Sequence, residues 1–554
     1  MTEGLIATTP RFLLGLDVGA SSAKAGLFDA ETGSVLGAGY VEYRMTSAVP
    51  GHAEHDAETW WQAAILAIRQ AIDGCDPAAI GAVGISCTNG LVAVDERGQP
   101  VRPAIMLWDQ RALPEVESIR RVLDPSRVFE ITGNPVAPGA YSLPTILWLK
   151  HHEPDTFAAA HKLLVPGGFL VARLTGEFTI DDSRACTTLL FDIRRREWHE
   201  PFLHALDIPP EKLPRPLPSH AVAGAVTAEA AELTGLRPGT PVIAGCMDTV
   251  AASIGSGMMA PGECFVIMGT AARVCTPLGT PSFDARFMNC THIVPGRWLA
   301  IGALNGIGSS LRWIRDTFGQ PEQSVARESG EDVYDLLTAQ AALAPPGSKG
   351  LIFLPYISGE RTPIWNPHAR GVFLGVTLGH TRRDFFRSVL EGTAFAIRHV
   401  VEILEQDVGL TIQDLRIGGT ASKSPVWNQI IADVLGKNLV SMTDPQTEVL
   451  GAAVLAGIGL GVYRDYTSAI ERQVRVGRAF APDAAAHAAY DRLFPLYRDL
   501  YKDVEPYFTR LANIDLPQAW VAQGDADEGG PDPDRAGRVR ETGLRPPAGE
   551  RVRR

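Results

Sequence analysis

The chain has 554 residues, of which 45% are hydrophobic and 21% are charged, and its formal net charge is -12. These values exclude a small stapled module and a largely disordered chain, and the length predicts two or more domains. The negative charge disfavours nucleic acid or an anionic membrane as the main partner, because binding a polyanion needs a concentrated cationic face.

The seven cysteines form no Cys-x-x-Cys pair, which favours reduced thiols. No signal peptide is recognisable at the N-terminus, and no apolar run approaches the roughly 18 residues of a membrane span. We therefore expect a cytoplasmic protein.

The first predicted element is a strand over Phe12–Leu16, followed by a turn of small residues and a second strand that starts at Lys24. The turn carries a carboxylate, a glycine and two hydroxyl groups: Asp17, Gly19, Ser21 and Ser22. Such a turn leaves backbone amides free to face an anion, and the carboxylate can reach a phosphate-bound Mg²⁺. The alternative is a plain hairpin turn, and no Walker-type Gly-x-x-x-x-Gly-Lys-Ser/Thr pattern occurs around it.

A helix is predicted from Asp56, which is a good N-cap, because apolar residues then recur at helical spacing. Short buried strands are predicted at 82–86 and 91–95. Farther along, the strand Pro241–Ala244 runs into Asp248, and a helix of small residues starts at Thr249. An aspartate at such a turn is most often a helix cap, although a carboxylate can also be a general base.

A second unit of strand, turn and strand covers residues 263–274, with Gly269 and Thr270 in its turn. It is a weak echo of the first unit and predicts two related halves that face each other. The Pro/Gly-containing segment just before it is the expected domain boundary.

The second half alternates helices and strands, which indicates an α/β fold. The strongest helix is predicted over Asp384–Gln406, and a helix over Ser424–Leu435 follows the strand Leu415–Ile417. The loop between this strand and this helix begins Gly418-Gly419-Thr420-Ala421. It suits either close approach of a flat nucleotide or a helix start without a ligand.

The order of these motifs resembles the FGGY carbohydrate kinases over residues 11 to 510. Leu14–Lys24 is similar to the family's first phosphate loop, and Gly245–Ala252 is similar to its Gly-x-x-Asp-x-x-Ala segment. Gly371–Val376, followed by Asp384-Phe385 and Ser388–Glu391, matches a family signature of the second domain.

The resemblance implies an α/β fold of two actin-like (ribonuclease H-like) ATPase domains with a central cleft. Residues 1–255 would be the sugar-binding N-terminal domain, 256–515 the ATP-binding C-terminal domain, and 516–554 a disordered tail. It implies Asp248 as catalytic base, ATP and Mg²⁺ as cofactors, and Asp17 and Asp248 near the metal. The implied nucleotide-binding residues are Asp17, Gly19, Ser21, Ser22, Lys24, Gly269, Thr270, Gly418, Gly419, Thr420, Ala421 and Asn428.

Within the family, Ser358–Pro363 and Pro295–Trp298 are most like the xylulokinases, which implies phosphorylation of D-xylulose to xylulose 5-phosphate. Where xylulokinases carry Gly-Gln-Met-His, this chain has Ser86-Cys87-Thr88-Asn89, and Ala20 replaces the usual hydroxyl residue of the phosphate loop. The implied substrate-binding residues are Cys87, Thr88, Asn89, Trp108, Asp109 and Asp248. Glu360 and Arg361 either touch the substrate or form a buried ion pair between the domains.

Three alternatives stay open. The substrate can be another ketose or polyol, such as ribulose, erythritol or glycerol. The chain can also be a sugar-responsive regulator without turnover, or an ATPase of the actin or chaperone type with a protein client. The partner expected from the resemblance is a small sugar or polyol, and a homodimer is a family-level expectation.

Overall fold

The computed structural model describes residues 11–44, 51–137, 140–444 and 446–514. The tail at 516–554, for which disorder is predicted, lies outside these residues. Two compact units are distinguished, one ending at Glu505 and one beginning at Pro506. Of the second unit, only the end of the last helix is described, and all contacts discussed below lie within the first.

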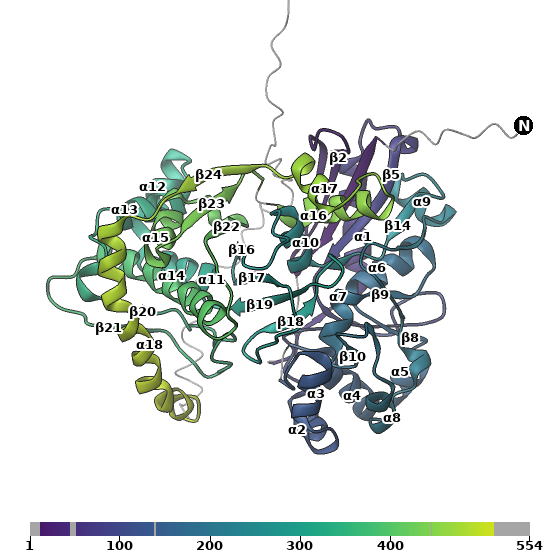
Figure 1. The fold of residues 1–554 in the computed structure, drawn as a ribbon, viewed down its shortest axis with the longest axis horizontal. Coiled ribbons are helices and arrows are strands. Elements are labelled where there is room, and N and C mark those ends of the chain that lie inside the picture. The colour runs from purple at the N-terminus through teal and green to yellow at the C-terminus, as the bar shows by residue number, and fades with distance from the viewer. Residues whose placement is uncertain (1–10, 45–50, 138–139, 445, 515–554) are drawn as a thin grey trace, which may run out of the picture. The chain divides into compact units, whose positions relative to one another are not determined.

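Two mixed sheets of seven strands each organise the first unit (Figure 1). The first sheet has the order β13 (Val222–Ala225), β14 (Pro241–Ile243), β5 (Ile80–Cys87), β1 (Phe12–Val18), β2 (Ser22–Asp29) and β3 (Val35–Glu42), with β15 (Cys246–Met247) also on β5. The second has the order β18 (Met288–Thr291), β19 (Trp298–Leu304), β17 (Ala272–Leu278), β16 (Cys264–Met268), β22 (Asp414–Gly418), β23 (Asn438–Met442) and β24 (Val476–Phe480).

Smaller sheets and the helices surround these two. The short strands are β4 (Glu54–His55), β6 (Gly90–Val94), β7 (Ala104–Met106), β8 (Lys162–Leu164), β9 (Thr179–Asp181), β10 (Phe191–Asp192), β11 (Glu197–Trp198), β12 (Arg215–Leu217), β20 (Ile352–Leu354) and β21 (Val372–Leu374). The helices of the first half are α1 (Ala57–Ala71), α2 (Leu113–Val122), α3 (Pro125–Thr132), α4 (Ser142–His152), α5 (Pro154–Ala159), α6 (Pro166–Thr175), α7 (Asp182–Ala185), α8 (Glu200–Ala205), α9 (Ala228–Thr234) and α10 (Asp248–Gly255). Those of the second half are α11 (Ile307–Phe318), α12 (Gln320–Ser329), α13 (Val333–Ala342), α14 (Arg382–Gln406), α15 (Pro425–Leu435), α16 (Thr447–Gly459), α17 (Tyr466–Gln473) and α18 (Ala484–Ala512).

The two sheets repeat one arrangement, as the sequence echo predicts. In the first, β1 pairs antiparallel with β2 and parallel with β5. In the second, β16 pairs antiparallel with β17 and parallel with β22. In each hairpin turn the glycine N–H donates to a carbonyl farther along the turn, at 2.9 Å: Gly19 to Ser22 and Gly269 to Ala271. The second turn is one residue shorter, so the strand arrangement repeats but the turn does not.

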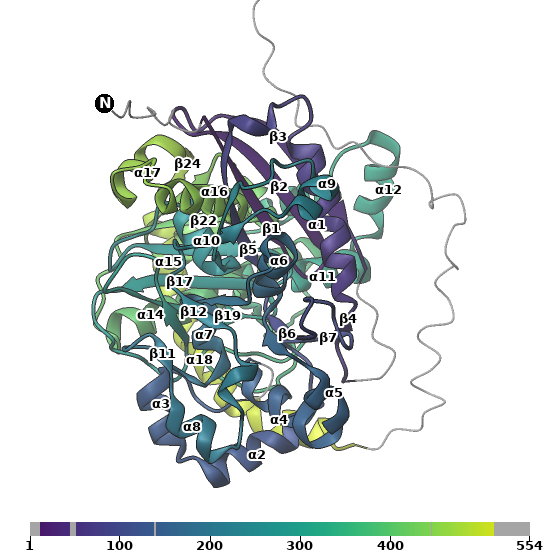
Figure 2. The same ribbon diagram turned by 90° about the vertical axis from the view of Figure 1, so that its right-hand side faces the viewer.

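Helices α10 and α16 lie between the two sheets (Figures 1 and 2). They approach each other so closely that a Cβ atom on Gly451 would lie 1.8 Å from the Ala251 carbonyl oxygen. On its other side α16 covers the first sheet, where a Cβ atom on Gly84 would lie 1.9 Å from the Ala452 carbonyl oxygen. Only glycine allows backbones this close, so these positions fix how α16 sits.

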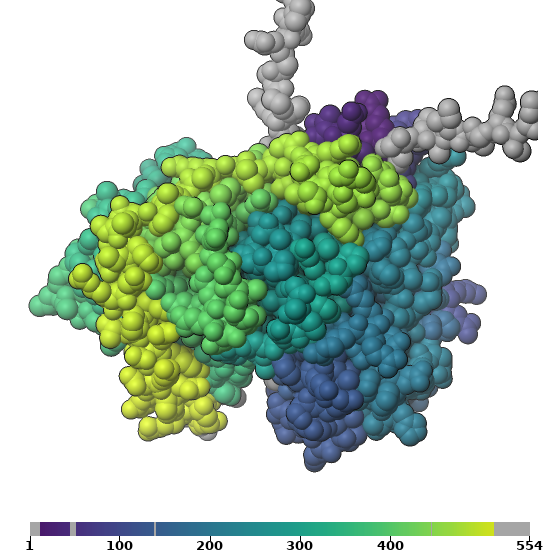
Figure 3. Space-filling model, in the orientation of Figure 1, coloured from purple at the N-terminus to yellow at the C-terminus, as the bar shows by residue number. Residues whose placement is uncertain are grey.

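The segment after α16 also contacts the first sheet. The Gln473 side-chain amide donates to the carbonyls of Asp29 and Ala30 at 3.1 Å, and the Arg475 guanidinium donates to the Thr32 carbonyl at 3.1 Å. The chain then enters β24, which pairs with β23 of the second sheet. Residues of α17 and β24 thus connect the two sheets, and they form the yellow-green surface at the top of Figure 3.

The predicted helices are confirmed, with starts shifted by one residue in α10 and α15 and by two in α14. The Asp56 carboxylate caps α1 by accepting from Glu58 N–H, and Ser424 caps α15. Helix α14 begins at Arg382, two residues before the predicted start, because Thr381 is its N-cap and Asp384 closes a capping box at the third helical position.

Candidate active site

The carboxylate of Asp17 is buried at the end of β1. Its Oδ1 accepts a hydrogen bond of 2.7 Å from the Ser86 hydroxyl on β5, and its Oδ2 lies 3.7 Å from Lys24 Nζ on β2. Burial raises the pKa of Asp17, and the charge of Lys24 opposes that effect. Ser86 belongs to the segment expected beside the sugar, but its hydroxyl group is used to hold Asp17.

Asp248 is the first residue of α10, directly after β15. Strand β15 pairs with β5 at Ser86, and β1 pairs with β5 at the same residue, so that Asp248 and Asp17 approach from strands that flank β5. The N–H and hydroxyl of Thr249 donate to Asp248 Oδ1 at 2.6 and 3.0 Å. Oδ2 lies 3.9 Å from Arg273 Nη2. One oxygen is therefore fixed by the helix start, and the other faces the second sheet.

Glu448, at the start of α16, is a further carboxylate at this site that the sequence interpretation missed. A Cβ atom on Gly15 would lie 2.1 Å from the Val449 carbonyl oxygen, and one on its cross-strand partner Gly26 would lie 2.9 Å from Val449 Cγ1. Because side chains alternate along a strand, Asp17 and Lys24 lie on this same α16-facing side. Glu448 immediately precedes Val449, which brings it to the Asp17–Lys24 pair.

Burial raises the pKa of Glu448 from its ordinary value of 4.5 to about 7, with Lys24 opposing the shift and Asp17 and Asp248 adding to it. Lys24 has the opposite balance: burial lowers its pKa, but the charges of Asp17 and Glu448 raise it more. Asp17 and Glu448 thus share the charge of one lysine.

The raised pKa of Glu448 predicts a pH-dependent stability. A carboxyl group whose pKa rises on folding stabilises the folded state fully below 4.5, and this contribution is lost as the pH rises through about 7. We expect Glu448→Gln to raise the melting temperature at about pH 8, with a smaller difference at about pH 5. Glu328→Gln, at an exposed position of α12, is the control. An equal effect of Glu448→Gln at both pH values would contradict the prediction.

The turn after β16 is braced by the start of α11. A Cβ atom on Gly308 would lie 2.1 Å from the Gly269 carbonyl oxygen, and Ser309 N–H donates to the Thr270 carbonyl at 2.9 Å. The Arg312 guanidinium donates to Thr270 Oγ1 at 3.2 Å. The Gly269 amide is occupied within the turn. An anion here would therefore meet the arginine and the amides that follow Gly269.

The loop after β22 lies against the same turn. Gly419 has a φ of +89°, and a Cβ atom on it would lie 2.4 Å from the Met268 carbonyl oxygen. Thr420 and Ala421 begin a 3₁₀ turn, after which Asn428 Nδ2 donates to the Ser422 carbonyl at 2.8 Å. Among the described residues, the buried Oδ1 of Asn428 has no hydrogen-bond partner. This unsatisfied acceptor fits an amino group of a bound base.

The residues expected on the sugar side form a buried network around β5 and β7. Cys87 ends β5, and Thr88 N–H donates to the Val18 carbonyl at 2.8 Å, beside the first phosphate loop. Asn89 Nδ2 donates to Thr187 Oγ1 at 2.7 Å. Burial raises the pKa of the Cys87 thiol well above its usual range, so it is a neutral group here.

Trp108 and Asp109 lie in the loop after β7 and differ in accessibility. Trp108 is 45% exposed, whereas Asp109 is buried. Both oxygens of Asp109 are engaged, because Arg111 donates to each at 2.9 Å and Ala53 N–H donates to Oδ2 at 2.5 Å. These bonds favour a role for Asp109 in holding its loop, and its contact with substrate stays a prediction.

Glu360 and Arg361 do not form the ion pair considered above; no such pair occurs within 4.0 Å in the described chain. Glu360 Oε1 instead accepts from the N–H groups of Asn305 and Arg361 at 2.7 and 2.8 Å, and Arg361 Nε donates to Asn305 Oδ1 at 2.9 Å. Burial raises the pKa of Glu360 to about 7. Both side chains therefore hold the end of β19.

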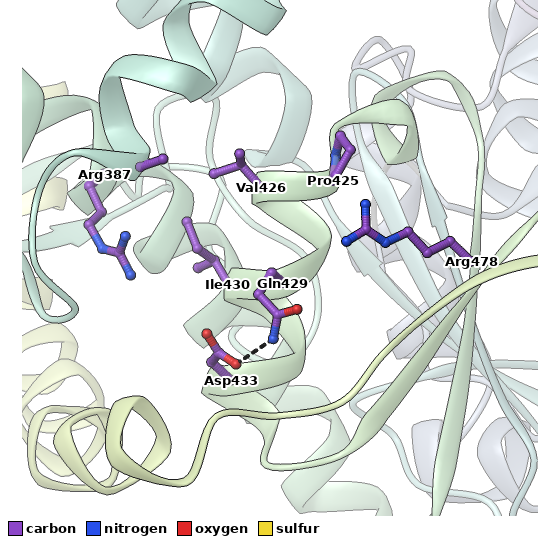
Figure 4. Close-up of a pocket in the computed structure, with 8 residues that line it drawn as sticks. Arg387, Pro425, Val426, Gln429, Ile430, Asp433 and Arg478 are labelled. Carbon is purple, nitrogen blue, oxygen red and sulfur yellow. Dashed lines mark hydrogen bonds between the residues drawn. The ribbon is translucent and has the colours of Figure 1, made fainter.

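A pocket of about 320 Å³ opens elsewhere, beside α15 (Figure 4). Its lining contains none of the predicted site residues and consists of Ala342, Arg387, Pro425, Val426, Gln429, Ile430, Asp433 and Arg478.

Within the described ranges, no three or more His, Cys, Asp or Glu side chains are grouped so as to hold a metal ion. In the same ranges, no helix combines the length and apolar character that crossing a membrane requires.

Known proteins resemble the chain over most of its length. Residues 12–255 match the N-terminal domain, and residues 264–460 the C-terminal domain, of the FGGY family of carbohydrate kinases. Xylulose kinase of Lactococcus lactis is 31% identical, over 91% of this chain and 99% of that protein. Gluconokinase of Bacillus subtilis is 29% identical, over 91% and 98%. The crystal structure of xylulose kinase from Rhodospirillum rubrum matches with a TM-score of 0.81 at 32% identity, covering 90% of this chain and all of that one. The match confirms the predicted two-domain α/β fold.

Proposed function

Because this chain belongs to the FGGY family of carbohydrate kinases, we propose that it transfers the γ-phosphate of ATP to a hydroxyl group of D-xylulose. Membership makes the chain a sugar kinase and confirms the resemblance seen in its motifs. The choice of D-xylulose is supported by the xylulose kinases of L. lactis and R. rubrum, at 31% and 32% identity. The gluconokinase of B. subtilis is nearly as similar, at 29% identity, so the choice of sugar needs an experiment.

The observation that carries the proposal is the geometry of Asp248. Thr249 holds Oδ1, so that Oδ2 is left to accept the proton of a hydroxyl group while the hydroxyl oxygen attacks the γ-phosphorus. Asp248 is joined through β15 and β5 to the buried Asp17. Asp248 is the proposed base, and Asp17 is the residue that orients the phosphates.

The loops that follow β1, β16 and β22 would hold the nucleotide. The unsatisfied Oδ1 of Asn428 supports base binding after β22, and Thr270 with Arg312 supports phosphate binding after β16. Mg²⁺ held by Asp17 and Asp248, directly or through water, would neutralise charge on the phosphate oxygens. Ser86 and Lys24 keep the Asp17 carboxylate in place for that contact.

A coupled assay of ADP release over a panel of sugars tests this function. We expect D-xylulose to raise the rate most, and ribulose, erythritol, glycerol and gluconate to be weaker acceptors. A preference for another sugar would change the proposed substrate and leave the assignment as a sugar kinase intact. If no sugar raises the rate while one still stabilises the protein against heat, the chain is a sugar-responsive regulator and the proposal is wrong.

A further inference from the structure

Arg273 presents a partly exposed guanidinium to the proposed base. It lies on β17, opposite Ile267 of β16 and Ala303 of β19, two residues after the turn of Gly269. Its Nη2 atom is 3.9 Å from Asp248 Oδ2, and the two side chains are 34% and 25% exposed. Within the described residues, Asp248 is its only carboxylate neighbour within 4.0 Å.

The distance distinguishes this pair from the buried arginine–carboxylate pairs of the same chain. Arg111 donates to both oxygens of Asp109 at 2.9 Å, and Arg184 donates to Asp181 at 2.5 Å, with all four side chains almost completely buried. A guanidinium that only braces a carboxylate forms such short bonds. At 3.9 Å, Arg273 forms none to Asp248 and keeps its donors for another group.

A second arginine adds to the positive charge. The Arg361 guanidinium donates to the Asn305 side chain, and in the described chain no carboxylate lies within 4.0 Å of that guanidinium; Glu360 accepts from the backbone N–H of Arg361 instead. Burial lowers the pKa of Arg361 to about 10, and the positive charge of Arg273 is the next cause. Arg361 and Arg273 thus lie close enough to influence each other, and together they add positive charge beside Asp248.

We propose that Arg273 is a catalytic residue that binds the transferring phosphoryl group. The inference rests on the proposed function. A hydroxyl group on Asp248 Oδ2 must point at the γ-phosphorus, so the equatorial phosphate oxygens lie next to Oδ2, where the guanidinium of Arg273 is. The turn of Gly269 and Thr270 joins β16 to β17, so that Arg273 follows on the same hairpin.

The step balances without another reactant. The hydroxyl oxygen forms a bond to the γ-phosphorus, the hydroxyl proton passes to Asp248 Oδ2, and the bond to the β,γ-bridging oxygen breaks with its electron pair leaving on ADP. Arg273 stabilises the negative charge on the three equatorial oxygens of the transferring phosphoryl group. A carboxylate of a sugar acid would offer the same oxyanion chemistry, and the experiment separates these two sources.

The test compares Arg273→Gln and Arg273→Lys with the wild-type chain on the best sugar of the panel. We expect Arg273→Gln to lower kcat about 10²- to 10³-fold, with KM for the sugar changed little and Arg273→Lys partly active. Arg383→Gln, on the surface of α14, is the matched control.

A binding measurement gives a readout other than turnover. Fluoroaluminate with ADP and sugar mimics the transferring phosphoryl group. We expect it to raise the melting temperature of the wild-type chain above that with ADP and sugar alone. The Arg273→Gln variant should keep the rise in melting temperature caused by ADP and sugar but lose the additional rise caused by fluoroaluminate.

The outcomes are distinct. Retention of the additional rise, or a loss of kcat smaller than about threefold, would overturn the role of Arg273. If Arg273→Gln raises KM for the sugar, and the wild-type chain prefers gluconate over neutral sugars, then Arg273 binds a substrate carboxylate. That result would also overturn its role in binding the phosphoryl group. A wild-type chain without sugar-dependent ADP release would reject the proposed function itself.

Discussion

Replacing Asp248 by Asn is expected to lower kcat about 10²- to 10⁴-fold, the range associated with loss of a general base. The amide is nearly isosteric with the carboxylate, and its oxygen can still accept the two bonds from Thr249. The change therefore removes proton acceptance while leaving the start of α10 in place. The measurement is sugar-dependent ADP release, with the melting temperature recorded alongside.

The control is Asp335→Asn, which changes an exposed aspartate on α13 in the same way. It should leave both kcat and the melting temperature unchanged. If Asp248→Asn retains sugar-dependent turnover within about threefold of the wild type, Asp248 is not the base. If activity falls only in parallel with the melting temperature, the carboxylate is a structural cap.

Replacing Gly451 by Ala is expected to destabilise the protein by about 3 kcal/mol or more, because the added methyl group meets backbone. A Cβ atom there would lie 1.8 Å from the Ala251 carbonyl oxygen, and helix α10 would have to move. The higher helix propensity of Ala, worth about 1 kcal/mol, does not offset this clash. The shift of the urea-unfolding midpoint, together with kcat, measures the effect.

Gly379→Ala is the matched control, because a Cβ atom there would meet only Thr377 Oγ1, at 3.7 Å. Its free energy of unfolding should stay within about 0.5 kcal/mol of the wild type. Movement of α10 also displaces Asp248, so Gly451→Ala should lose activity below its unfolding midpoint. Wild-type stability and activity for Gly451→Ala would contradict the close packing of α10 and α16.

Local signals in the sequence were sufficient for the elements that carry the loops. Apolar runs ended by small residues predict β1 and β16, the strand-like pattern from Lys24 predicts β2, and the N-cap Asp56 with helical spacing predicts α1. These features depend on neighbours a few residues away. The predicted start of α14 is two residues late, because the helix begins after Thr381, whose capping box Asp384 completes.

The charges around the site could not be predicted, since they depend on contacts between distant segments. Glu448 reaches the Asp17–Lys24 pair only because glycines let α16 approach the first sheet. Arg273 could have been noticed as a charged residue in an apolar strand, but its distance to Asp248 depends on how the two sheets meet. The roles assigned to the individual site residues remain predictions.

The bonds from Gln473 to the carbonyls of Asp29 and Ala30 have a consequence for biosynthesis. Strands β1 and β2 are synthesised well before the helix that covers Gly15 and Gly84, which begins more than 350 residues after Gly84, at Thr447. Until that helix has been made, the nascent first sheet has one face without its cover. The first sheet is thus completed by a segment made much later, and we expect its uncovered face to be prone to aggregation in the interval.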